Sequence, residues 1–522
     1  MRYPHHVRHT AYWAGLLLAV SACAPLPPPE AENSAEFPRV LARETLTFGY
    51  GRIVEKYLDV LAVDAIAMEG IRGLSSLDPS ITVTRRDDSI IVSHGDRTIG
   101  QYRAPEANNV ANWAALTVDV AAAGRSASRE MRQANIEKIY EAVFDGALAN
   151  LDIFSRYAGP EEARESRAKR DGFGGIGVNY VANGAGLRIT QVLPGTPAEA
   201  AGLQKDDIIT HIDGDATATM TSLTVTERLR GPLRSRVNLI VQRNDEIPPR
   251  FVSLDRGLII PSTVTAKTTN GILNVQIASF NQNTATSLTE AVEAALSPPG
   301  RPLRGIVLDM RGNPGGLLRQ AIRVADLFLN EGDIIDTQGR HPDSFQHYEA
   351  TGADIARNLP LVVLTDGRSA SAAEIVAAAL QDRGRAIIVG TTSFGKGTVQ
   401  TIIPMPNDGE VTLTWSRLLT PSGYALHGLG VRPNVCTSGL VGEDLAAINR
   451  VLAGEASAGE SVKAWHRVGL YDQKSRDALR QECPAERHKD DMESRIAHRL
   501  ISDPVLYAHA LDLASPQAAA GR

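Results

Sequence analysis

The segment Leu361–Gln400 constrains the fold more than any other part of the chain. It begins with the apolar run LVVL, continues with the helix-like sequence AAEIVAAALQD, and returns to a second apolar run, AIIVG. Lengths and apolar spacing predict strand, helix and strand in that order. Loops that follow parallel strands lie at the same edge of a sheet. We therefore expect Ser371, in the first loop, to lie near Lys396, in the second, as in a serine hydrolase with a lysine base.

Both residues have simpler interpretations. Ser371 with Glu374 spells a capping box before an apolar helix, so the hydroxyl could only satisfy backbone donors. Lys396 could be a solvated turn lysine. The sequence from Gly390 to Lys396 also approaches a phosphate-binding P-loop, but Gly397 stands where that motif needs Ser or Thr. Strand-like sequence follows instead of a helix N-terminus, which argues against a phosphate site.

The N-terminus has the features of an exported protein. A basic and His-rich start precedes an apolar stretch, Ala11–Val20, that is too short to span a membrane. Residues 1–22 are predicted to be a signal peptide, and the VSAC sequence ending at Cys23 resembles the bacterial lipobox. That resemblance implies a lipid on Cys23, with Ala24 favouring the outer membrane. Residues 23–38 would form a Pro-rich tether. An ordinary cleaved signal peptide remains the alternative.

The composition is that of a globular protein: 43% of residues are hydrophobic and the formal net charge is -6. That charge gives no reason to expect nucleic-acid binding. The chain has three cysteines. If Cys23 carries lipid, Cys436 and Cys483 remain as a candidate disulfide in an oxidising compartment. No cysteine or histidine spacing suggests a metal site, and no cofactor is expected.

Two regions precede the Ser/Lys segment. Residues 39–168 have mainly helical patterns, with an alternating stretch, ITVTRRDDSIIVSHGDRTIGQY, that predicts a β-hairpin. The charged run 161–171 is expected to be a solvated connection. Residues 172–256 resemble a PDZ domain, with short strands, PAEAAGL and DDIITHIDG in the expected order. Asp206 is a departure from the usual glycine, and the glycine expected within 233–235 is absent.

The PDZ resemblance suggests a peptide-binding edge. A glycine-rich turn can present backbone N–H groups to a terminal carboxylate, and the next strand can accept an added β-strand. The turn residues would be Gly174, Gly175, Ile176 and Gly177.

Residues 260–435 hold the expected catalytic core. The strand GIVLDM ends in RGNPGG and enters an amphipathic helix, a place where a backbone N–H can face developing negative charge. The alternative is that RGNPGG forms only a tight turn and has no role in catalysis.

The order of these blocks resembles the carboxy-terminal processing, or tail-specific, proteases. The resemblance covers roughly residues 130–435 and rests on LDMRGNPGG, SASAAEIVAAALQDRGRA, SFGKGTVQ and TPSGYALHGLGVRPNV. It implies an α/β fold with a crotonase/ClpP-like core, an inserted PDZ domain and an N-terminal helical region. It also assigns roles: Ser371 as nucleophile, Lys396 as base, Gln400 as the residue that orients the lysine, Gly316 and Ala372 as oxyanion donors, Asp382 as support, and Arg230 as a link between the PDZ domain and the site.

These roles agree with simple chemistry. A serine hydroxyl needs a base, and lysine serves as one only where burial lowers its pKa. Phe394 in the lysine loop is a candidate apolar cover. A Ser/His/Asp triad would need His427, which lies within another block of the resemblance.

The sequence therefore predicts a membrane-tethered endopeptidase on the periplasmic side of a bacterial envelope. Its partners would be proteins with accessible C-terminal tails, the membrane through a lipid anchor, and an adaptor lipoprotein. The alternative is a non-catalytic PDZ scaffold that binds tails. Residues 437–522 form a helical extension to which the sequence assigns no role.

Overall fold

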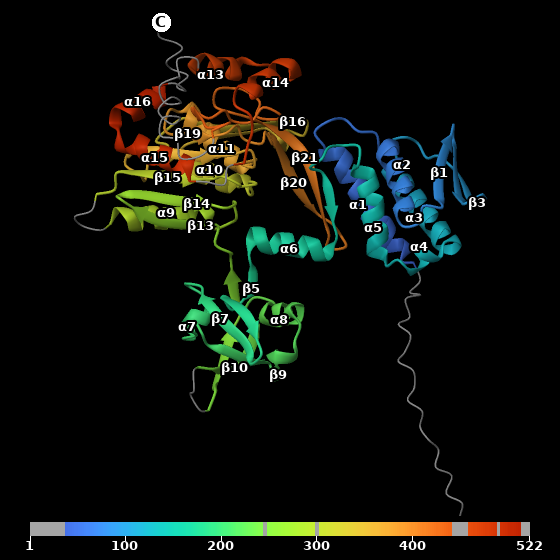
Figure 1. Ribbon diagram of the computed structural model, residues 1–522. Coiled ribbons are helices and arrows are strands. Elements are labelled where there is room, and N and C mark those ends of the chain that lie inside the picture. The colour runs from blue at the N-terminus through green and yellow to red at the C-terminus, as the bar shows by residue number, and fades with distance from the viewer. Residues whose placement is uncertain (1–36, 244–247, 298–301, 441–457, 488–490, 513–522) are drawn as a thin grey trace, which may run out of the picture.

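The computed structural model describes residues 37–243, 248–297, 302–440, 458–487 and 491–512 (Figure 1). The expected signal peptide, Cys23 and nearly all of the tether lie outside these residues. No helix within the described ranges combines the length and apolarity needed to cross a bilayer.

The centre of the molecule is a six-stranded sheet in the order β13-β14-β15-β18-β19-β22. Neighbours from β14 to β22 run parallel, and only the edge strand β13 is antiparallel. Its strands are β13 (Val264–Thr269), β14 (Ile272–Ile277), β15 (Gly305–Asp309), β18 (Leu361–Thr365), β19 (Ile387–Gly390) and β22 (Val435–Cys436).

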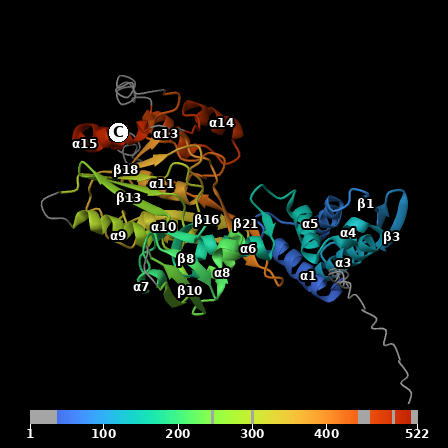
Figure 2. The same ribbon diagram turned by 60° about the horizontal axis from the view of Figure 1, so that its bottom comes forward.

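Both faces of this sheet are covered by helices, as continuous apolar strands require. One face packs on α9 (Thr284–Leu296), α10 (Leu318–Asp326) and α11 (Ala372–Asp382). The other packs on α15 (Met492–Ser502) and α16 (Pro504–Asp512), which belong to the C-terminal extension. Figure 2 shows α9 and α15 on opposite sides of the strands. The extension is thus the second layer of the core.

A second sheet links the core to the N-terminal region. It has the order β17-β16-β21-β20, with β4 paired to β21. Ile403 and Leu413 of the β20–β21 hairpin belong to the same apolar cluster as Tyr50 and Phe144 of the N-terminal helices. The strands are β4 (Arg156–Ala158), β16 (Asp333–Gly339), β17 (Gln346–Glu349), β20 (Thr398–Pro404) and β21 (Glu410–Leu419).

The N-terminal region is mainly helical, and its sheet has three strands where the sequence predicted a two-stranded hairpin. A third strand, β3, joins it because the turn at Gly95 is followed by another alternating segment. The elements are α1 (Arg39–Lys56), α2 (Val63–Gly73), β1 (Ile81–Arg86), β2 (Ser89–His94), β3 (Arg97–Arg103), α3 (Val110–Ala127), α4 (Arg129–Gln133) and α5 (Ile136–Leu148).

The charged run forms a helix, α6 (Pro160–Asp171), in which Ala163 is the one buried residue, as a solvated connection requires. Pro160 occupies the first turn, where a missing N–H costs nothing. Glu161 and Glu162 follow at the positive end of the helix dipole, and Arg170 lies in the last turn at the negative end.

The domain that resembles PDZ is built on a small sheet with the strand order β11-β10-β8-β7-β6, in which β6 is an edge strand. Asp206 has a φ of 72°, a conformation that favours the glycine usual there. The elements are β5 (Phe173–Gly175), β6 (Val178–Asn183), β7 (Gly186–Val192), α7 (Pro197–Ala200), β8 (Ile208–Ile212), β9 (Asp215–Ala216), α8 (Ser222–Leu229), β10 (Arg236–Gln242), β11 (Arg250–Asp255) and β12 (Gly257–Ile259).

Two more helices of the extension, α13 (Ala458–Arg467) and α14 (Gln473–Glu482), lie beside the core. The structure joins Cys436 and Cys483 in a disulfide with Cα atoms 6.0 Å apart. The bond therefore fastens the end of α14 to the last strand of the central sheet.

Candidate active site

Three loops interlock at the carboxyl edge of the parallel strands. The Asp366 carboxylate, after β18, accepts the backbone N–H of Gly312, after β15, at 2.8 Å. Ala370 N–H donates to the Asn313 carbonyl at 2.9 Å. Phe394 N–H, after β19, donates to the Ser369 carbonyl at 3.0 Å. The expected meeting of the two loops that carry Ser371 and Lys396 is therefore present.

Ser371 lies at a sharp turn between β18 and α11. Its φ of 55° and ψ of -114° are unusual for a residue with a side chain. Such a conformation costs about 1–3 kcal/mol and persists where neighbours enforce it. Gly315 packs directly against the turn, because a Cβ added there would lie 2.8 Å from Ser371 Cβ. The backbone thus presents the hydroxyl as nucleophilic serines are presented at other strand-to-helix turns.

The carboxylate of Glu374 connects the two candidate catalytic residues. Its Oε2 accepts the Ser371 N–H at 2.7 Å and the Lys396 N–H at 2.9 Å. Its Oε1 accepts the Gly395 N–H at 2.7 Å and the Ser393 hydroxyl at 2.5 Å. The side chain is fully buried. Glu374 therefore joins the helix start to the lysine loop.

Burial raises the pKa of Glu374, and the four hydrogen-bond donors around the carboxylate oppose that rise. The backbone N–H groups can only donate, and Ser393 Oγ already accepts the Val431 N–H at 2.8 Å. Ser393 Oγ keeps a second lone pair, so the three backbone N–H groups are the contacts that disfavour a proton on Glu374. The sequence identified Glu374 only as part of a capping box, since nothing local signals its bonds to the lysine loop.

Lys396 points its amine at an aromatic ring. Nζ lies 4.7 Å from the centroid of the Phe154 ring, which comes from the loop between α5 and β4. No hydrogen bond joins Nζ to Ser371 Oγ in the part of the chain that the structure describes. Burial lowers the pKa of Lys396, assisted by the Arg156 charge and opposed by Glu374 and Asp152. A lowered pKa is what a lysine base needs.

The expectation for Phe394 is wrong. Its side chain is 49% exposed, whereas Phe154 provides the aromatic contact to the lysine. Phe154 was missed because it belongs to the N-terminal region and reaches the site only through the tertiary fold.

Gln400 does not hydrogen-bond to Lys396 within the described residues. Its Nε2 donates to Thr398 Oγ1 at 3.0 Å and to Thr414 Oγ1 at 3.2 Å. Thr414 Oγ1 donates in turn to the Asp152 carboxylate at 3.0 Å. Gln400 is thus connected to the loop that carries Phe154, and through it to the surroundings of the lysine.

The two expected oxyanion donors lie beside the serine. Ala372 is the residue after Ser371, and Gly316 follows the glycine that packs on it. Gly315 N–H is used by Asn313 Oδ1 at 2.8 Å. In the described ranges, neither Gly316 N–H nor Ala372 N–H donates to another protein group, so both could serve an oxyanion.

Asp382 is a buried structural residue and not an exposed helix end. Its Oδ2 accepts the Ser422 N–H at 2.9 Å and the Ser422 hydroxyl at 2.7 Å. Its Oδ1 lies 3.4 Å from His466 Nε2 of the extension. These contacts fix the end of α11, in accord with a supporting role.

His427 does not form a triad with the serine. Its ring lies 6.5 Å, centroid to centroid, from the Phe154 ring, and no hydrogen bond connects it to Ser371 among the described residues. Burial lowers the pKa of His427.

The glycine-rich PDZ segment is partly a strand. Gly174 and Gly175 belong to β5, which pairs antiparallel with β12, so the turn itself is confined to Ile176 and Gly177. Gly177 has a φ of 88°, which favours glycine. The sequence suggested a turn throughout because paired β12 lies far along the chain. Arg230 stacks on Phe173, with Cζ 3.9 Å from the ring centroid.

The edge strand β6 lies next to helix α8. Tyr180 OH and Thr226 Oγ1, one from each element, are 3.2 Å apart. This is an open strand edge of the kind that accepts an added peptide strand.

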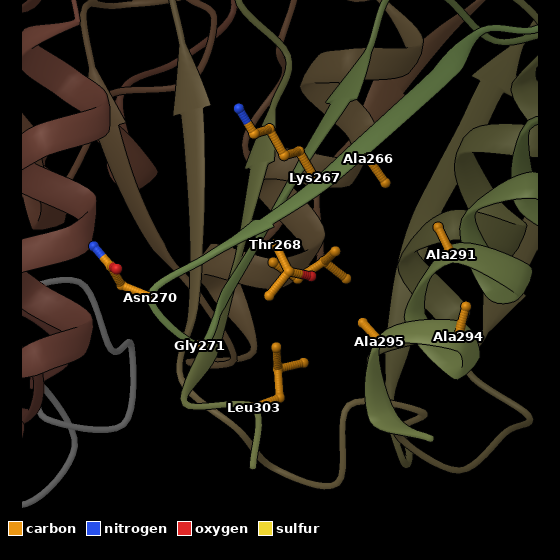
Figure 3. A pocket seen from close by; sticks show the side chains of 10 residues that line it. Ala266, Lys267, Thr268, Asn270, Gly271, Ala291, Ala294, Ala295 and Leu303 are labelled. Atoms are coloured by element: carbon orange, nitrogen blue, oxygen red, sulfur yellow. The ribbon is translucent and has the colours of Figure 1, made fainter. Parts of the chain in front are cut away.

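A cavity of about 700 Å³ lies elsewhere, between β13, β14 and α9. Ala291 and Ala295 on the helix face Thr268 on the strand (Figure 3). Gly271 and Leu303 in its lining precede β14 and β15. The cavity therefore belongs to the amino edge of the sheet, opposite the Ser371 loop.

Asp333, His347 and Glu349 form an exposed cluster on β16 and β17, with candidate ligand atoms within 4.8 Å of one another. Hydrogen bonds to Glu349 and Asp336 raise the pKa of His347 to about 9. At neutral pH the imidazole is therefore protonated and forms ion pairs with these carboxylates.

Comparison with known proteins gives matches to two families. The family profile described as Peptidase family S41 matches residues 271–437, and that of the PDZ domain matches residues 188–243. A carboxy-terminal-processing protease of Bartonella bacilliformis is 34% identical over 374 residues, 71% of this chain and 85% of that protein. A carboxyl-terminal-processing protease of Synechocystis sp. is 34% identical over 345 residues, 65% of this chain and 78% of that protein.

Among solved structures, a photosystem II D1 C-terminal processing protease is 27% identical. It covers 60% of this chain and 87% of its own, with a TM-score of 0.35. The predicted α/β class with a PDZ domain and an N-terminal helical region is confirmed. The chain belongs to the carboxy-terminal processing proteases of peptidase family S41 and is a serine-type peptidase.

Proposed function

We propose that this protein is a membrane-tethered endopeptidase that grips C-terminal tails through its PDZ domain and cleaves by a Ser371–Lys396 mechanism. The observation that carries the mechanism is the shared Glu374 oxygen, which binds the backbone N–H of both residues. The lowered pKa of Lys396 supports its role as the base. The similarity to proteases that process carboxyl termini supports C-terminal tails as the substrate class.

Acylation begins when Lys396 takes the proton from Ser371 Oγ. In the structure Nζ lies over the Phe154 ring. Proton transfer therefore requires the lysine side chain to turn from the ring to the hydroxyl. Oγ then bonds to the scissile carbonyl carbon, and the oxyanion is met by the N–H groups of Gly316 and Ala372.

The C–N bond breaks as Lys396 passes the proton to the leaving amine. Water, deprotonated by the same lysine, then hydrolyses the acyl-enzyme and regenerates the serine. Each oxyanion donor contributes about 3 kcal/mol in comparable sites.

Substitution of the two residues tests the mechanism. Ser371→Ala and Lys396→Ala should each abolish cleavage of a protein with an apolar C-terminal tail. Retention of cleavage by either variant would contradict the proposal. Mass spectrometry of trapped acyl-enzyme in the wild type should place the adduct on Ser371.

Tail recognition is tested by peptide binding to Ser371→Ala. Fluorescence anisotropy should show binding of a peptide with a free C-terminal carboxylate and weaker binding of the same peptide with an amidated C-terminus. Equal binding of the two would remove the carboxylate as the recognised group. A wild-type protein that binds the tail but never cuts would favour the scaffold alternative.

The envelope location rests on the N-terminal sequence. A lipid on Cys23 and a periplasmic position are proposed from the VSAC sequence and the signal-like stretch before it. Metabolic labelling with palmitate should mark the wild type and not Cys23→Ala, and fractionation should move that variant from the outer membrane to the soluble periplasm.

A further inference from the structure

The helices α13 and α14 of the C-terminal extension make several hydrogen bonds to one turn of the core, residues 425–430. Arg476 Nη2 donates to the Ala425 carbonyl at 3.1 Å and also to the His427 carbonyl. Arg480 Nη1 donates to the Leu429 carbonyl, and Trp465 Nε1 donates to the Gly430 carbonyl at 3.2 Å. The side chains of Trp465 and Arg476 are fully buried.

This turn lies directly against the loop that carries Lys396. Gly428 N–H donates to the Gly395 carbonyl at 2.8 Å. A Cβ added at Gly397 would lie 1.9 Å from the His427 nitrogen, so the two backbones touch. Residues 425–430 therefore form one wall of the lysine loop.

Arg480 also reaches the lysine loop itself. Its Nη1 donates to the Ser393 carbonyl at 3.2 Å. The hydroxyl of the same Ser393 donates to Glu374, whose other oxygen holds the N–H groups of Ser371 and Lys396. An uninterrupted path of hydrogen bonds thus runs from α14 to the serine and the lysine.

We propose that Arg480 is a positioning residue for the Ser/Lys site, and that the C-terminal extension fixes the lysine loop through it. The guanidinium bridges two carbonyls, Ser393 and Leu429, that belong to the loop and to its wall. Carbonyls without this donor would turn toward water, and the loop would loosen around Lys396. The inference rests on the proposed Ser/Lys mechanism.

The expected effect is on chemistry more than on substrate binding. The tail is gripped by a separate domain, so KM should stay within about twofold while kcat falls about tenfold, since small displacements of catalytic groups are costly. Water admitted beside Lys396 should raise its pKa. Arg156, Glu374 and Asp152 face that amine, and Arg480 faces Glu374.

The experiment compares full-length Arg480→Ala with Lys474→Ala, an exposed residue of the same helix. Arg480→Ala should lower kcat, move the acid limb of the pH profile of kcat/KM to higher pH, and regain activity with millimolar guanidinium or ethylguanidinium. Lys474→Ala should behave as wild type and show no gain with either cation. Both Arg480 bonds come from Nη1. Arg480→Lys keeps the charge on a shorter side chain without the planar guanidinium, and should recover only part of kcat.

Two results would overturn the inference. One is a kinetic match between Arg480→Ala and Lys474→Ala. The other is a lower melting temperature for Arg480→Ala with neither a shifted acid limb nor guanidinium rescue, which would make Arg480 a purely structural residue. Failure of Ser371→Ala or Lys396→Ala to abolish cleavage would instead refute the proposed mechanism.

Discussion

Lys396 Nζ lies over the face of Phe154, 4.7 Å from the ring centroid, although the two residues belong to different regions of the chain. The ring has two opposite effects on the amine. It excludes water, which favours the neutral form, and its negative face attracts the charged form. Burial dominates, because the pKa of Lys396 is lowered.

Two substitutions of Phe154 should separate these effects. A lysine base works when neutral, so activity is lost as pH falls through its pKa. Phe154→Ala admits water, raises the pKa of Lys396 and should move the acid limb of kcat/KM up by about half a unit to one unit. Phe154→Leu keeps the apolar cover and removes the ring face, so its acid limb should stay or move down. Equal upward shifts in both variants would show that burial by Phe154 is not the cause.

Glu374→Gln should disturb the positions of Ser371 and the lysine loop while leaving the size of the side chain almost unchanged. A carboxamide presents two N–H donors, so at least one bond to the surrounding donors is replaced by a donor–donor conflict. We expect a free energy of unfolding lower by about 1.5–3 kcal/mol, the range for hydrogen bonds to charged groups. Labelling of Ser371 by a fluorophosphonate should slow at least tenfold.

Glu290→Gln is the matched control for that change. Glu290 is an exposed residue on α9, away from the Ser371 loop. Its unfolding and labelling should match the wild type. Normal labelling of Glu374→Gln would show that the shared carboxylate does not position the serine.

The disulfide between Cys436 and Cys483 should stabilise the folded protein. It closes a loop of sequence separation 47. In the chain-entropy treatment such a loop contributes about 4 kcal/mol by restricting the unfolded chain. The double variant Cys436→Ser with Cys483→Ser should unfold at lower urea concentration than the oxidised wild type. A reductant should shift the wild type and leave the double variant unchanged, and a shift in both would point to another cause.

Leu500 tests the extension as a layer of the core. It is fully buried on α15 against the central sheet. Leu500→Ala should lower the free energy of unfolding by about 2–5 kcal/mol, as in other buried Leu→Ala changes. Val505→Ala, at a position that is 81% exposed, should change it by less than about 0.5 kcal/mol. Similar urea midpoints for the two variants would contradict the packing of α15 on the sheet.

Much of the core could be predicted from the sequence, because strands, helices and turns leave patterns in residues that are adjacent in the chain. The strand–helix–strand pattern of Leu361–Gln400 is present as β18, α11 and β19, and its loops interlock. The PDZ region was likewise recognised from short motifs in order. The third strand β3 and the pairing of Gly174 and Gly175 were missed, since each depends on where a second segment lies.

The sequence by itself determined that this chain has a parallel α/β core, a PDZ domain before it, and a serine and a lysine on neighbouring loops. Strand and helix periodicity and turn residues are enough for the core and for the two loops. The PDZ domain was recognised from the resemblance of its motifs to that domain. Only the tertiary structure decided what surrounds the lysine. Phe154 contacts the lysine from the N-terminal region, and Arg480 hydrogen-bonds to the lysine loop from the extension. Glu374, which the sequence identified as a helix cap, also accepts the backbone N–H of Lys396. The reason is physical: burial and hydrogen bonding set the pKa and position of Lys396, and both come from segments far away in sequence.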